Sequence, residues 1–354
     1  MSERADTRAE LPETMDAAVY LGDGVVEVQE IPSPQLHDEG AIVEVSHCGI
    51  CGTDLHFVLE GMGRKGSVFG HEWSGTVVAL GAAAATTVAI GTQVVAADRA
   101  GCGRCRACLA GRPSVCLDRA TPNYFGGTGA FTRYMHVDAS RLLPLPAGVS
   151  LRDAALTEPV AIAMHAHTVS GVGPSDRVLV TGAGPVGLLM VAVLKAAGVD
   201  DITVSEPAAA RRDRAAALGA AVVTPDALPK APTGRPVAEP FTYAFECSGR
   251  AAACEAALDQ LDKAGTFVFL GTGAEMPRIN HNRVIILELT LMGSYNYDTD
   301  GFAAALTLLA SGRLPLDLLI EPDDVPLDAV GAAMRRLGAG ELAGKALVVP
   351  EVSS

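Results

Sequence analysis

The feature that most constrains the fold is a glycine-rich turn between an apolar strand and an apolar helix. The segment "VLVTGAGPVGLLMVAVLKAAG" places Gly182, Gly184 and Gly187 in a G-x-G-x-x-G spacing, with Pro185 and Val186 at the start of the helix. The first glycine permits a tight turn, the second lets a diphosphate approach the backbone, and the third lets helix and strand pack closely. Free amide groups and the helix dipole favour negative charge at this helix start. The segment therefore predicts a strand–turn–helix unit that binds a dinucleotide.

A carboxylate at the end of the next predicted strand indicates which dinucleotide binds. Glu206 ends the segment "DITVSE" and follows Gly187 by 19 residues. A carboxylate there can accept hydrogen bonds from both ribose hydroxyls of NAD and would repel the 2′-phosphate of NADP. Arg211 and Arg212 leave an alternative open, because guanidinium groups bind phosphate, although they could also be solvated or stack on adenine. We therefore expect Glu206 and Arg211 to contact the cofactor, with NAD favoured over NADP.

The pattern around this turn predicts an α/β protein with more than one domain. From about 161 to 300, short apolar strands alternate with alanine-rich segments, which is typical of a parallel sheet covered by helices on both faces. Residues 1–160 hold short strand-like pieces rich in valine and glycine, and predict a small barrel-like β domain. We expect 301–354 to return to this first domain, since the strand-like "KALVVP" needs a sheet to join.

Length and composition limit the class of protein. A chain of 354 residues exceeds the size at which one core keeps growing, so two domains are expected. A formal net charge of −14 does not attract phosphate backbones or anionic membranes, so we expect no nucleic-acid partner. The uncharged run 73–97 is divided by glycines into pieces of strand length, so we expect no membrane span. The charged N-terminus without an apolar segment, together with the crowded cysteines, favours the cytoplasm.

Four cysteines within one short segment indicate a structural metal site. The sequence "CGRCRACLAGRPSVC" has the spacing C-x2-C-x2-C-x7-C and contains Cys102, Cys105, Cys108 and Cys116. Four thiolates complete the tetrahedral coordination of Zn²⁺ and leave no open position. An iron–sulfur cluster is the competing interpretation, because its cysteines can be equally close.

A second set of possible metal ligands is dispersed along the chain. Cys51 lies in "HCGICGTDLH", His71 and Glu72 lie in "FGHEWSG", and Glu158 lies in "LTEPVAIAMHA". A thiolate, an imidazole and a carboxylate can hold zinc and leave a position for substrate, as a catalytic site requires. Taken singly, His71 could be a hydrogen-bonded core histidine and Glu158 a helix cap. The spacing of Cys48 and Cys51 also leaves a metal clip or a redox dithiol open.

Together these residues resemble one family, the zinc-containing medium-chain alcohol dehydrogenases. The likeness runs from "GICGTDLH" through "GHEWSG", the four-cysteine segment, "EPVAIAMHA" and "TGAGPVG" to "GKALVVP". It implies a GroES-like β-barrel catalytic domain and a Rossmann domain with a doubly wound parallel sheet. It also implies two zinc ions per chain, of which the catalytic ion is bound by Cys51, by His71 and by Glu72 or Glu158. Cys48 is then a bystander.

The resemblance further implies the interconversion of an alcohol and a ketone by hydride transfer to or from NAD. Zinc acts as a Lewis acid on the substrate oxygen, and the glycine-rich turn holds the nicotinamide nearby. The implied proton path begins at Thr53 and passes through the cofactor ribose to His56, whose imidazole suits proton transfer near neutral pH. Without the resemblance, His56 is simply a polar residue at a helix start.

Within the family, the motifs are most similar to the polyol, butanediol and threonine dehydrogenases. The sorbitol-dehydrogenase branch has a tyrosine and an arginine near the substrate, where this chain has Phe57 and Asn296. Without that hydroxyl and guanidinium, a less polar secondary alcohol is at least as good a candidate as a polyol. The alternatives are an NADP-linked carbonyl reductase of the same fold and a non-catalytic nucleotide-binding zinc protein. The family implies a homodimer or homotetramer, often paired through the last strand of the nucleotide domain, here "LTLMGSY".

Overall fold

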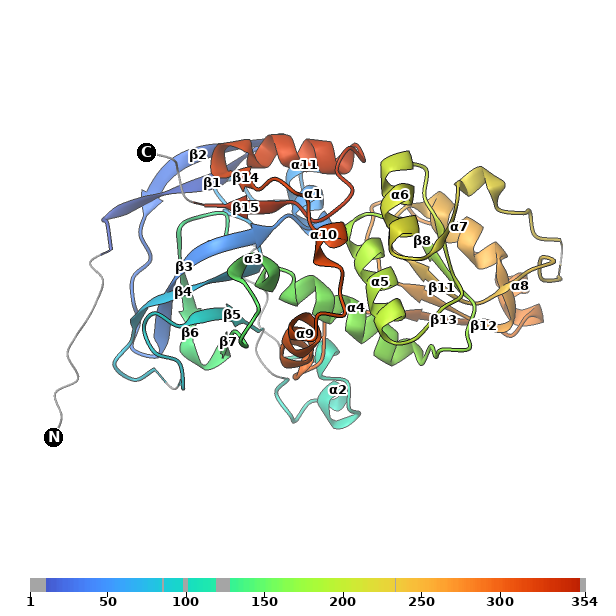
Figure 1. The fold of residues 1–354 in the computed structure, drawn as a ribbon, viewed down its shortest axis with the longest axis horizontal. Coiled ribbons are helices and arrows are strands. Elements are labelled where there is room, and N and C mark those ends of the chain that lie inside the picture. The colour runs from blue at the N-terminus through green and yellow to red at the C-terminus, as the bar shows by residue number, and fades with distance from the viewer. Residues whose placement is uncertain (1–10, 85, 98–100, 119–127, 233, 351–354) are drawn as a thin grey trace.

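The computed structural model describes residues 11–84, 86–97, 101–118, 128–232 and 234–350, which form a β-rich part and a parallel-sheet part side by side (Figure 1). The parallel-sheet part has the strand order β10-β9-β8-β11-β12-β13. After β8 the chain builds one half of the sheet and then crosses to β11 on the other side. Sheets of this kind bind ligands at the carboxyl ends of their strands, where the strand order reverses. The strands are β8 (Val178–Thr181), β9 (Ile202–Ser205), β10 (Ala221–Val223), β11 (Phe241–Glu246), β12 (Leu261–Phe269) and β13 (Thr290–Gly293).

Helices flank this sheet, as the alternating sequence pattern predicts. Helix α5 follows the glycine-rich turn, and residues 187–194 of this helix are all buried. A helix that is apolar all round belongs in a protein core, which explains the uncharged run in the sequence. The flanking helices are α5 (Pro185–Ala196), α6 (Ala209–Ala217), α7 (Ala251–Asp259) and α8 (His281–Ile286).

The β-rich part contains a seven-stranded sheet and a separate hairpin. The sheet has the order β14-β15-β3-β4-β5-β7, with β6 paired to β3, and the hairpin is formed by β1 and β2. Strand β15 pairs antiparallel with β3, with Val348 opposite Cys48, so the C-terminal strand joins this sheet. The strands are β1 (Thr14–Gly22), β2 (Val25–Pro32), β3 (Gly40–Gly49), β4 (Glu72–Leu80), β5 (Gln93–Ala96), β6 (Tyr134–Asp138), β7 (Leu142–Pro144), β14 (Val325–Pro326) and β15 (Leu347–Val349).

Helix α4 (Thr157–Ser170) links the two parts. It packs against β4 in the β-rich part and against α5 and α9 (Gly301–Ala310) on the other side, and it ends at Gly171, which has the left-handed conformation that glycine favours. The remaining helices are α1 (Gly52–Leu59), α2 (Arg106–Leu109), α3 (Leu151–Ala154), α10 (Leu316–Leu319) and α11 (Val330–Gly338), with 3₁₀ turns at Pro113–Val115, Ala139–Arg141, Pro225–Ala227 and Leu327–Ala329.

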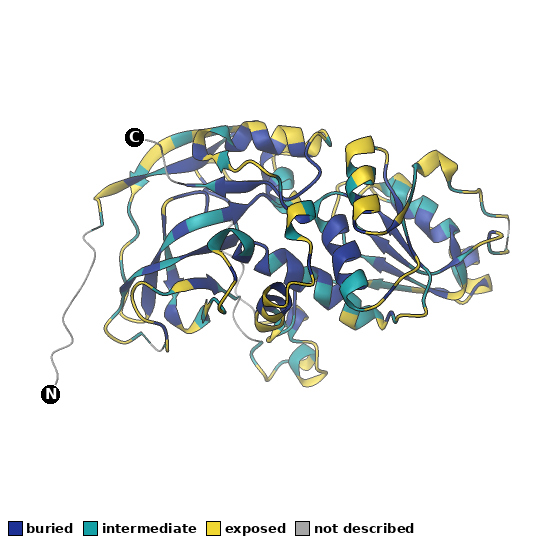
Figure 2. Cartoon of the chain, viewed as in Figure 1, coloured by how far each residue is buried: buried dark blue, intermediate teal, exposed yellow. Residues whose placement is uncertain are grey.

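Burial follows the two sheets and the inner faces of their helices (Figure 2). Two large apolar clusters result, one centred on α4, α5 and β8 and the other on β1, β3 and β4. Within the described ranges, no helix has the length and apolar character needed to cross a membrane. The architecture confirms the predicted α/β class with a barrel-like β part and a parallel sheet.

Candidate active site

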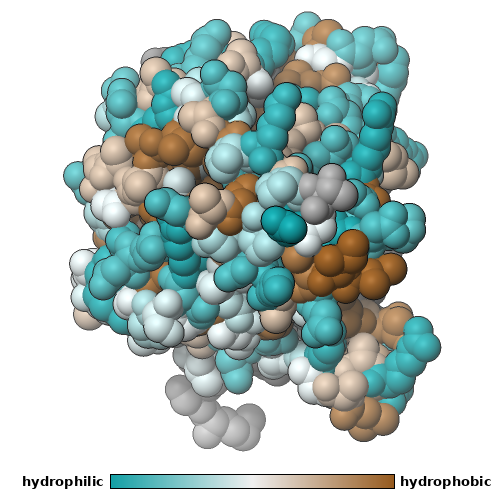
Figure 3. Space-filling model, turned by 90° about the vertical axis from the view of Figure 1, so that its right-hand side faces the viewer, coloured by the Kyte–Doolittle hydropathy of each residue, from teal (hydrophilic) through white to brown (hydrophobic). Residues whose placement is uncertain are grey.

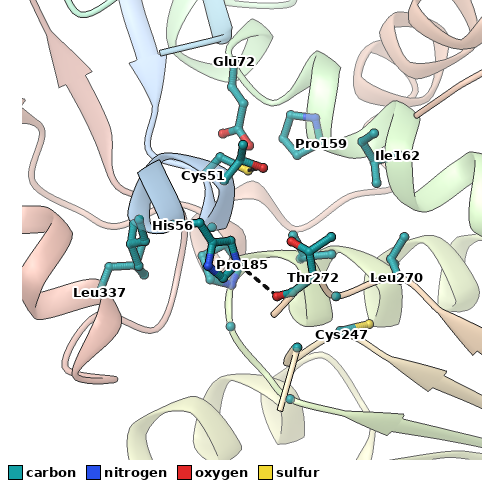
Figure 4. Close-up of a pocket in the computed structure, with 18 of the residues that line it drawn as sticks. Cys51, His56, Glu72, Pro159, Ile162, Pro185, Cys247, Leu270, Thr272 and Leu337 are labelled. Atoms are coloured by element: carbon teal, nitrogen blue, oxygen red, sulfur yellow. Dashed lines mark hydrogen bonds between the residues drawn. The ribbon is translucent and has the colours of Figure 1, made fainter. Parts of the chain in front are cut away.

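A cavity of about 1450 Å³ lies between the two parts and collects most of the predicted site residues. The β-rich part lines it with α1 and the start of β4, and the parallel-sheet part lines it with the glycine-rich turn and the loop after β12 (Figure 4). The lining residues from the sequence predictions are Cys51, Thr53, His56, His71, Glu72, Glu158, Gly182, Gly184, Pro185, Val186, Glu206 and Arg211. Gly187 lies outside the lining, and a side chain on it would collide with the backbone of Gly182, as expected for the glycine that permits helix–strand packing.

Three of the predicted metal ligands meet in the cavity. Ligand atoms of Cys51, His71 and Glu72 all lie within 4.8 Å of one another. Cys51 precedes α1, while His71 and Glu72 lie where β4 begins. Glu158 lines the same cavity from the first turn of α4, but its carboxylate is not within this group. Sulfur, nitrogen and oxygen donors at this separation fit a zinc ion with one position open to substrate.

Asp54 connects two of these residues and was not among the predicted site residues. Its carboxylate accepts a hydrogen bond of 2.9 Å from the backbone amide of Cys51 and lies 3.6 Å from Nδ1 of His71. Burial alone would lower the pKa of His71, but the Asp54 carboxylate and the Cys51 sulfur outweigh it and raise the pKa well above its usual value. A carboxylate on the outer nitrogen of a ligand histidine orients the ring toward a metal. The sequence signal was an acid three residues after Cys51, in the first turn of a helix.

Lys345 is the second residue that sequence reasoning missed. Its ammonium lies 2.6 Å from Oε2 of Glu72, and each side chain is 1% exposed. The ammonium also donates to the carbonyl of Ile50 at 3.2 Å. Burial favours the neutral amine, yet the adjacent Glu72 carboxylate raises the pKa of Lys345 overall. A side chain on Gly49 would collide with the Glu72 carboxylate, so the glycine leaves room for this ion pair.

Cys48 does not join the metal group. It lies on β3 with 0% exposure, packed in the apolar cluster of the β-rich part. Burial raises the pKa of its thiol well above the usual value, which disfavours the reactive thiolate.

Thr53 and His56 lie on the cavity side of α1. The Thr53 hydroxyl is 3.7 Å from the Cys51 sulfur. Nε2 of His56 lies 3.0 Å from the carbonyl oxygen of Thr272, across the cavity on the loop after β12 (Figure 4). Nδ1 of the same ring lies 2.9 Å from Glu60. His56 therefore contacts both parts of the molecule.

The charged residues near the glycine-rich turn are held by backbone groups. Glu206 is 3% exposed and accepts hydrogen bonds from the amides of Ala183 at 2.7 Å and Ala208 at 2.9 Å. The Arg211 guanidinium donates to the carbonyls of Leu337 and Leu342 in the segment around the end of α11. The acid thus lies at the base of the turn, and Arg211 spans the two parts.

The Arg212 guanidinium donates to the carbonyls of Glu206 and Pro207. This binding to the backbone favours the structural interpretation of Arg212 over phosphate binding.

The four cysteines of the predicted structural site lie together in a lobe around α2. Their sulfur atoms are within 4.8 Å of one another. Backbone amides donate to the sulfur atoms, including those of Cys105 to Cys102 at 3.3 Å and of Cys108 to Cys105 at 3.5 Å. Hydrogen bonds from the backbone amides of Cys108 and then Leu117 lower the pKa of Cys105 to about 6. Four close thiols with amide donors fit a closed zinc site.

Phe57 and Asn296 occupy different positions relative to the cavity. Phe57 does not line the cavity, because its ring stacks on Phe69 at a centroid distance of 5.4 Å within the core. The Phe57 ring therefore packs in the core and does not line the cavity, and the effect of its missing hydroxyl on substrate polarity stays a prediction. Asn296 does line the cavity, in a left-handed backbone conformation with φ of 61°. Other lining residues in this region include Trp73, Ile162, Leu270 and Phe302.

The fold, the dinucleotide turn and the thiol-containing donor set define a zinc-binding dehydrogenase. The family models agree: residues 37–147 match the alcohol dehydrogenase GroES-like domain, and residues 185–311 match the zinc-binding dehydrogenase model. The chain belongs to the zinc-containing medium-chain alcohol dehydrogenase family, and it is an oxidoreductase that acts on CH–OH groups.

Individual proteins show the same relationship. The chain is 32% identical to 2-dehydro-3-deoxy-L-galactonate 5-dehydrogenase of Pseudoalteromonas atlantica, over 94% of this chain and 98% of the relative. The crystal structure of 2R,3R-butanediol dehydrogenase from Bacillus subtilis has a TM-score of 0.82 at 28% identity, over 95% of this chain and 100% of that chain. A putative zinc-binding dehydrogenase from Sinorhizobium meliloti bound to NADP also has a TM-score of 0.82 at 28% identity, over 96% and 100%.

Proposed function

We propose that this dehydrogenase interconverts a secondary alcohol or polyol and its ketone, with NAD(H) and a zinc ion held by Cys51, His71 and Glu72. The observation that carries the proposal is the position of this donor group, which lines one cavity together with the glycine-rich turn. Glu158, on the first turn of α4, is the alternative carboxylate ligand of the zinc ion. A non-catalytic nucleotide-binding protein would have no need of these donors beside Thr53 and His56.

The chain's own residues supply binding, orientation and proton transfer. Zinc, when bound, supplies Lewis acidity that favours the ionised form of an alcohol, and NAD accepts the hydride. Asp54 orients the His71 ring, and Lys345 balances the charge of Glu72. The Thr53 hydroxyl lies 3.7 Å from the Cys51 sulfur, beside the proposed metal, and is the group that would accept a proton from the substrate and pass one toward His56.

The substrate is a small alcohol or ketone with an apolar flank. Trp73, Ile162, Leu270 and Phe302 give the cavity an apolar wall, while Asn296 adds one amide that can bind a hydroxyl. The relatives at 28% to 32% identity act on butanediol and on a sugar acid, so both small diols and longer polyols belong in the test panel.

NAD is the proposed cofactor because of Glu206. Its buried carboxylate lies beside the turn, where a ribose is expected, and the guanidinium groups of Arg211 and Arg212 donate to backbone carbonyls. An enzyme that prefers NADP would instead support the carbonyl-reductase alternative.

Metal analysis and one pair of variants test the proposed function. The purified protein should contain two zinc ions per chain, one in each donor group, and should show no visible chromophore from iron and sulfur. Cys51→Ala should lose one zinc and all NAD-linked oxidation of a secondary-alcohol panel, while the far-UV circular dichroism is retained. The matched control Cys48→Ala removes the other thiol of the same segment. It should keep two zinc ions per chain and the NAD-linked oxidation. Turnover by Cys51→Ala would reject the ligand assignment.

We also propose a homodimer or homotetramer in the cytoplasm. Strand β13 is the last strand of the parallel sheet, so one edge of it is unpaired within the described chain. Ile285 and Ile286 of the neighbouring α8 are 68% and 56% exposed. Apolar side chains gather in patches on this end of the molecule (Figure 3). Pairing of two β13 edges would cover unsatisfied backbone groups. Light scattering after size exclusion should show an oligomer, and Met292→Pro on β13 should shift it toward the monomer.

A further inference from the structure

We propose that Glu246 is a positioning residue of the cofactor site, which holds the loops after β11 and β12 in the arrangement that receives the nicotinamide half of the dinucleotide. This inference rests on the proposed function, because that function supplies the cofactor. Glu246 is the last residue of β11 and is 2% exposed. The proposed chemistry makes no use of its carboxylate, and a buried charge is kept only where its surroundings compensate it.

The strand order places Glu246 beside the expected cofactor. Strands β8 and β11 are neighbours where the order reverses, and residues at or just after the end of each strand line the cavity. A dinucleotide crosses a sheet of this kind at such a point. Glu206, directly after β9, marks the adenosine side under the proposed function. The nicotinamide half therefore extends over the ends of β11 and β12.

The carboxylate of Glu246 binds the loop after β11. Oε1 accepts hydrogen bonds from the Ser248 amide at 2.8 Å and from the Ser248 hydroxyl, and the Gly249 amide donates to both carboxylate oxygens at 3.1 Å. All of these partners are donors, which suits an ionised carboxylate. Burial raises the pKa of Glu246, and the bonds from Ser248 and Gly249 oppose that rise. One side chain thus supplies the acceptor for three donors of a single turn.

The backbone carbonyl of Glu246 binds the loop after β12. It accepts hydrogen bonds from the amides of Leu270 at 3.0 Å and Gly271 at 2.7 Å. The next residue, Thr272, presents its carbonyl to Nε2 of His56, and Leu270 and Thr272 lie on the same side of the cavity (Figure 4). Glu246 is therefore the common anchor of two loops that line the cavity.

The two loops and the glycine-rich turn pack backbone against backbone. A side chain on Gly182 would collide with Ser248, and a side chain on Gly249 would collide with the Thr272 carbonyl. Gly249 also has a left-handed backbone conformation with φ of 67°. Loss of the acceptor at position 246 should therefore displace Ser248 and Gly249 and disturb the surface on which the dinucleotide lies.

Calorimetric titration of the zinc-loaded protein with NADH tests this proposal. Glu246→Ala removes the acceptor for three donors, so the Kd for NADH should rise about tenfold and the KM for NAD should rise with it. Glu246→Gln keeps one oxygen that can accept from the Ser248 amide, so it should raise the Kd only about two- to threefold. Zinc content should equal that of wild type in both variants.

Gln260→Ala is the matched control for a purely structural role. Gln260 is also 2% exposed and its side-chain amide donates to the carbonyls of Pro229 and Ala256, but it does not line the cavity. Its loss should lower the Tm and leave the Kd for NADH unchanged. An unchanged Kd in Glu246→Ala, or an equal rise in Gln260→Ala, would overturn the proposal. Where Glu246→Ala does not fold, the same comparison is made with Glu246→Gln.

This titration separates the proposal from the proposed function, because NADH binding requires no alcohol. A protein that binds NADH and oxidises no member of the alcohol panel would reject the proposed function, and the Kd values would still decide the role of Glu246. A wild-type protein that binds no NADH would reject both.

Discussion

Glu72 and Lys345 lie against each other with almost no contact with solvent, so each buried charge depends on the other for compensation. Two buried charges are tolerated because each compensates the other, whereas the loss of one partner leaves the other unpaired. A bound zinc ion would also offset the negative charge of the Glu72 carboxylate, because it is a divalent cation. The pair therefore matters most to the metal-free protein.

Lys345→Met should destabilise the metal-free protein by about 3 to 5 kcal/mol, because it leaves the Glu72 carboxylate buried and uncompensated. Urea unfolding after zinc removal by a chelator measures this change. The double variant Glu72→Gln/Lys345→Met removes both charges and should recover much of the loss. A single variant as stable as wild type would show that the ion pair does not form in solution.

Replacement of Glu206 by serine should reduce the preference for NAD over NADP at least tenfold, which corresponds to about 1.4 kcal/mol of binding energy. The carboxylate that repels a 2′-phosphate is lost, and the hydroxyl of serine is too short to bridge Ala183 and Ala208 in its place. The ratio of kcat/KM for the two cofactors is the measurement. Arg212→Gln provides the control, since Arg212 donates to backbone carbonyls and its loss should leave the ratio nearly constant.

At this scale the sequence predicts residues that belong to local motifs and misses residues defined by tertiary contacts. Cys51, His71 and Glu72 could be proposed because each lies in a short recognisable stretch, and the structure brings them together. The partnership of Lys345 with Glu72 depends on the pairing of β15 with β3, which no local pattern reveals. The position of the Phe57 ring could not be predicted, because the direction of a side chain on a short helix depends on what the helix packs against.

At the scale of elements, the predictions made from the strand and helix patterns agree best with the structure. The alternation after residue 160 predicts the parallel sheet, and the uncharged run after β8 is the buried helix α5. The pairing order of the short strands in the β-rich part could not be predicted, because strands of three to five residues carry little information about their neighbours.

Replacement of one cysteine in the four-cysteine lobe should be enough to remove its zinc ion. Cys105→Ser removes both a ligand and the sulfur that accepts the Cys108 amide, so zinc content should fall from two to one per chain and the Tm should drop by several degrees. Inductively coupled plasma analysis and calorimetry make the measurement. Cys254→Ser in α7 changes a buried thiol outside both metal groups and should keep two zinc ions. Two zinc ions per chain in Cys105→Ser would show that the four-cysteine lobe is not a zinc site.

A second element-scale prediction concerns the loop after β13, which carries Asn296. Nδ1 of His165, a buried residue on α4, lies 3.0 Å from Asp298 on this loop. The bond ties the loop to the helix that also carries Glu158 and Ile162. Asp298→Ala should therefore raise KM for the alcohol severalfold with little change in zinc content or KM for NAD. Asp300→Ala, two residues along, is the control; equal effects of the two changes would mean that the bond does not fix the cavity wall.

At the scale of the whole molecule, three histidines outside the two metal groups contribute to the response of stability to pH. His47 on β3, His136 on β6 and His167 on α4 are half-buried, and burial is the main cause that lowers the pKa of each below 6.5. The Arg152 charge adds to the effect at His47, although Asp324 opposes it, and His37 adds to the effect at His136. Below pH 6.5 the unfolded chain therefore binds protons that the folded chain takes up only at lower pH.

The sign of this linkage makes the fold less stable as acid is added. The contribution of the three neutral rings to the free energy of unfolding is fully present above about pH 6.5. It is lost as the pH falls through the lowered pKa values that these rings have in the folded protein. The urea midpoint, measured with excess zinc, should therefore decrease between pH 7.5 and 5.5. His136→Gln removes one titrating ring and should flatten this decrease, whereas His281→Gln, at an exposed position on α8, should not. A wild-type midpoint that stays constant over the range would show that burial does not hold these rings neutral.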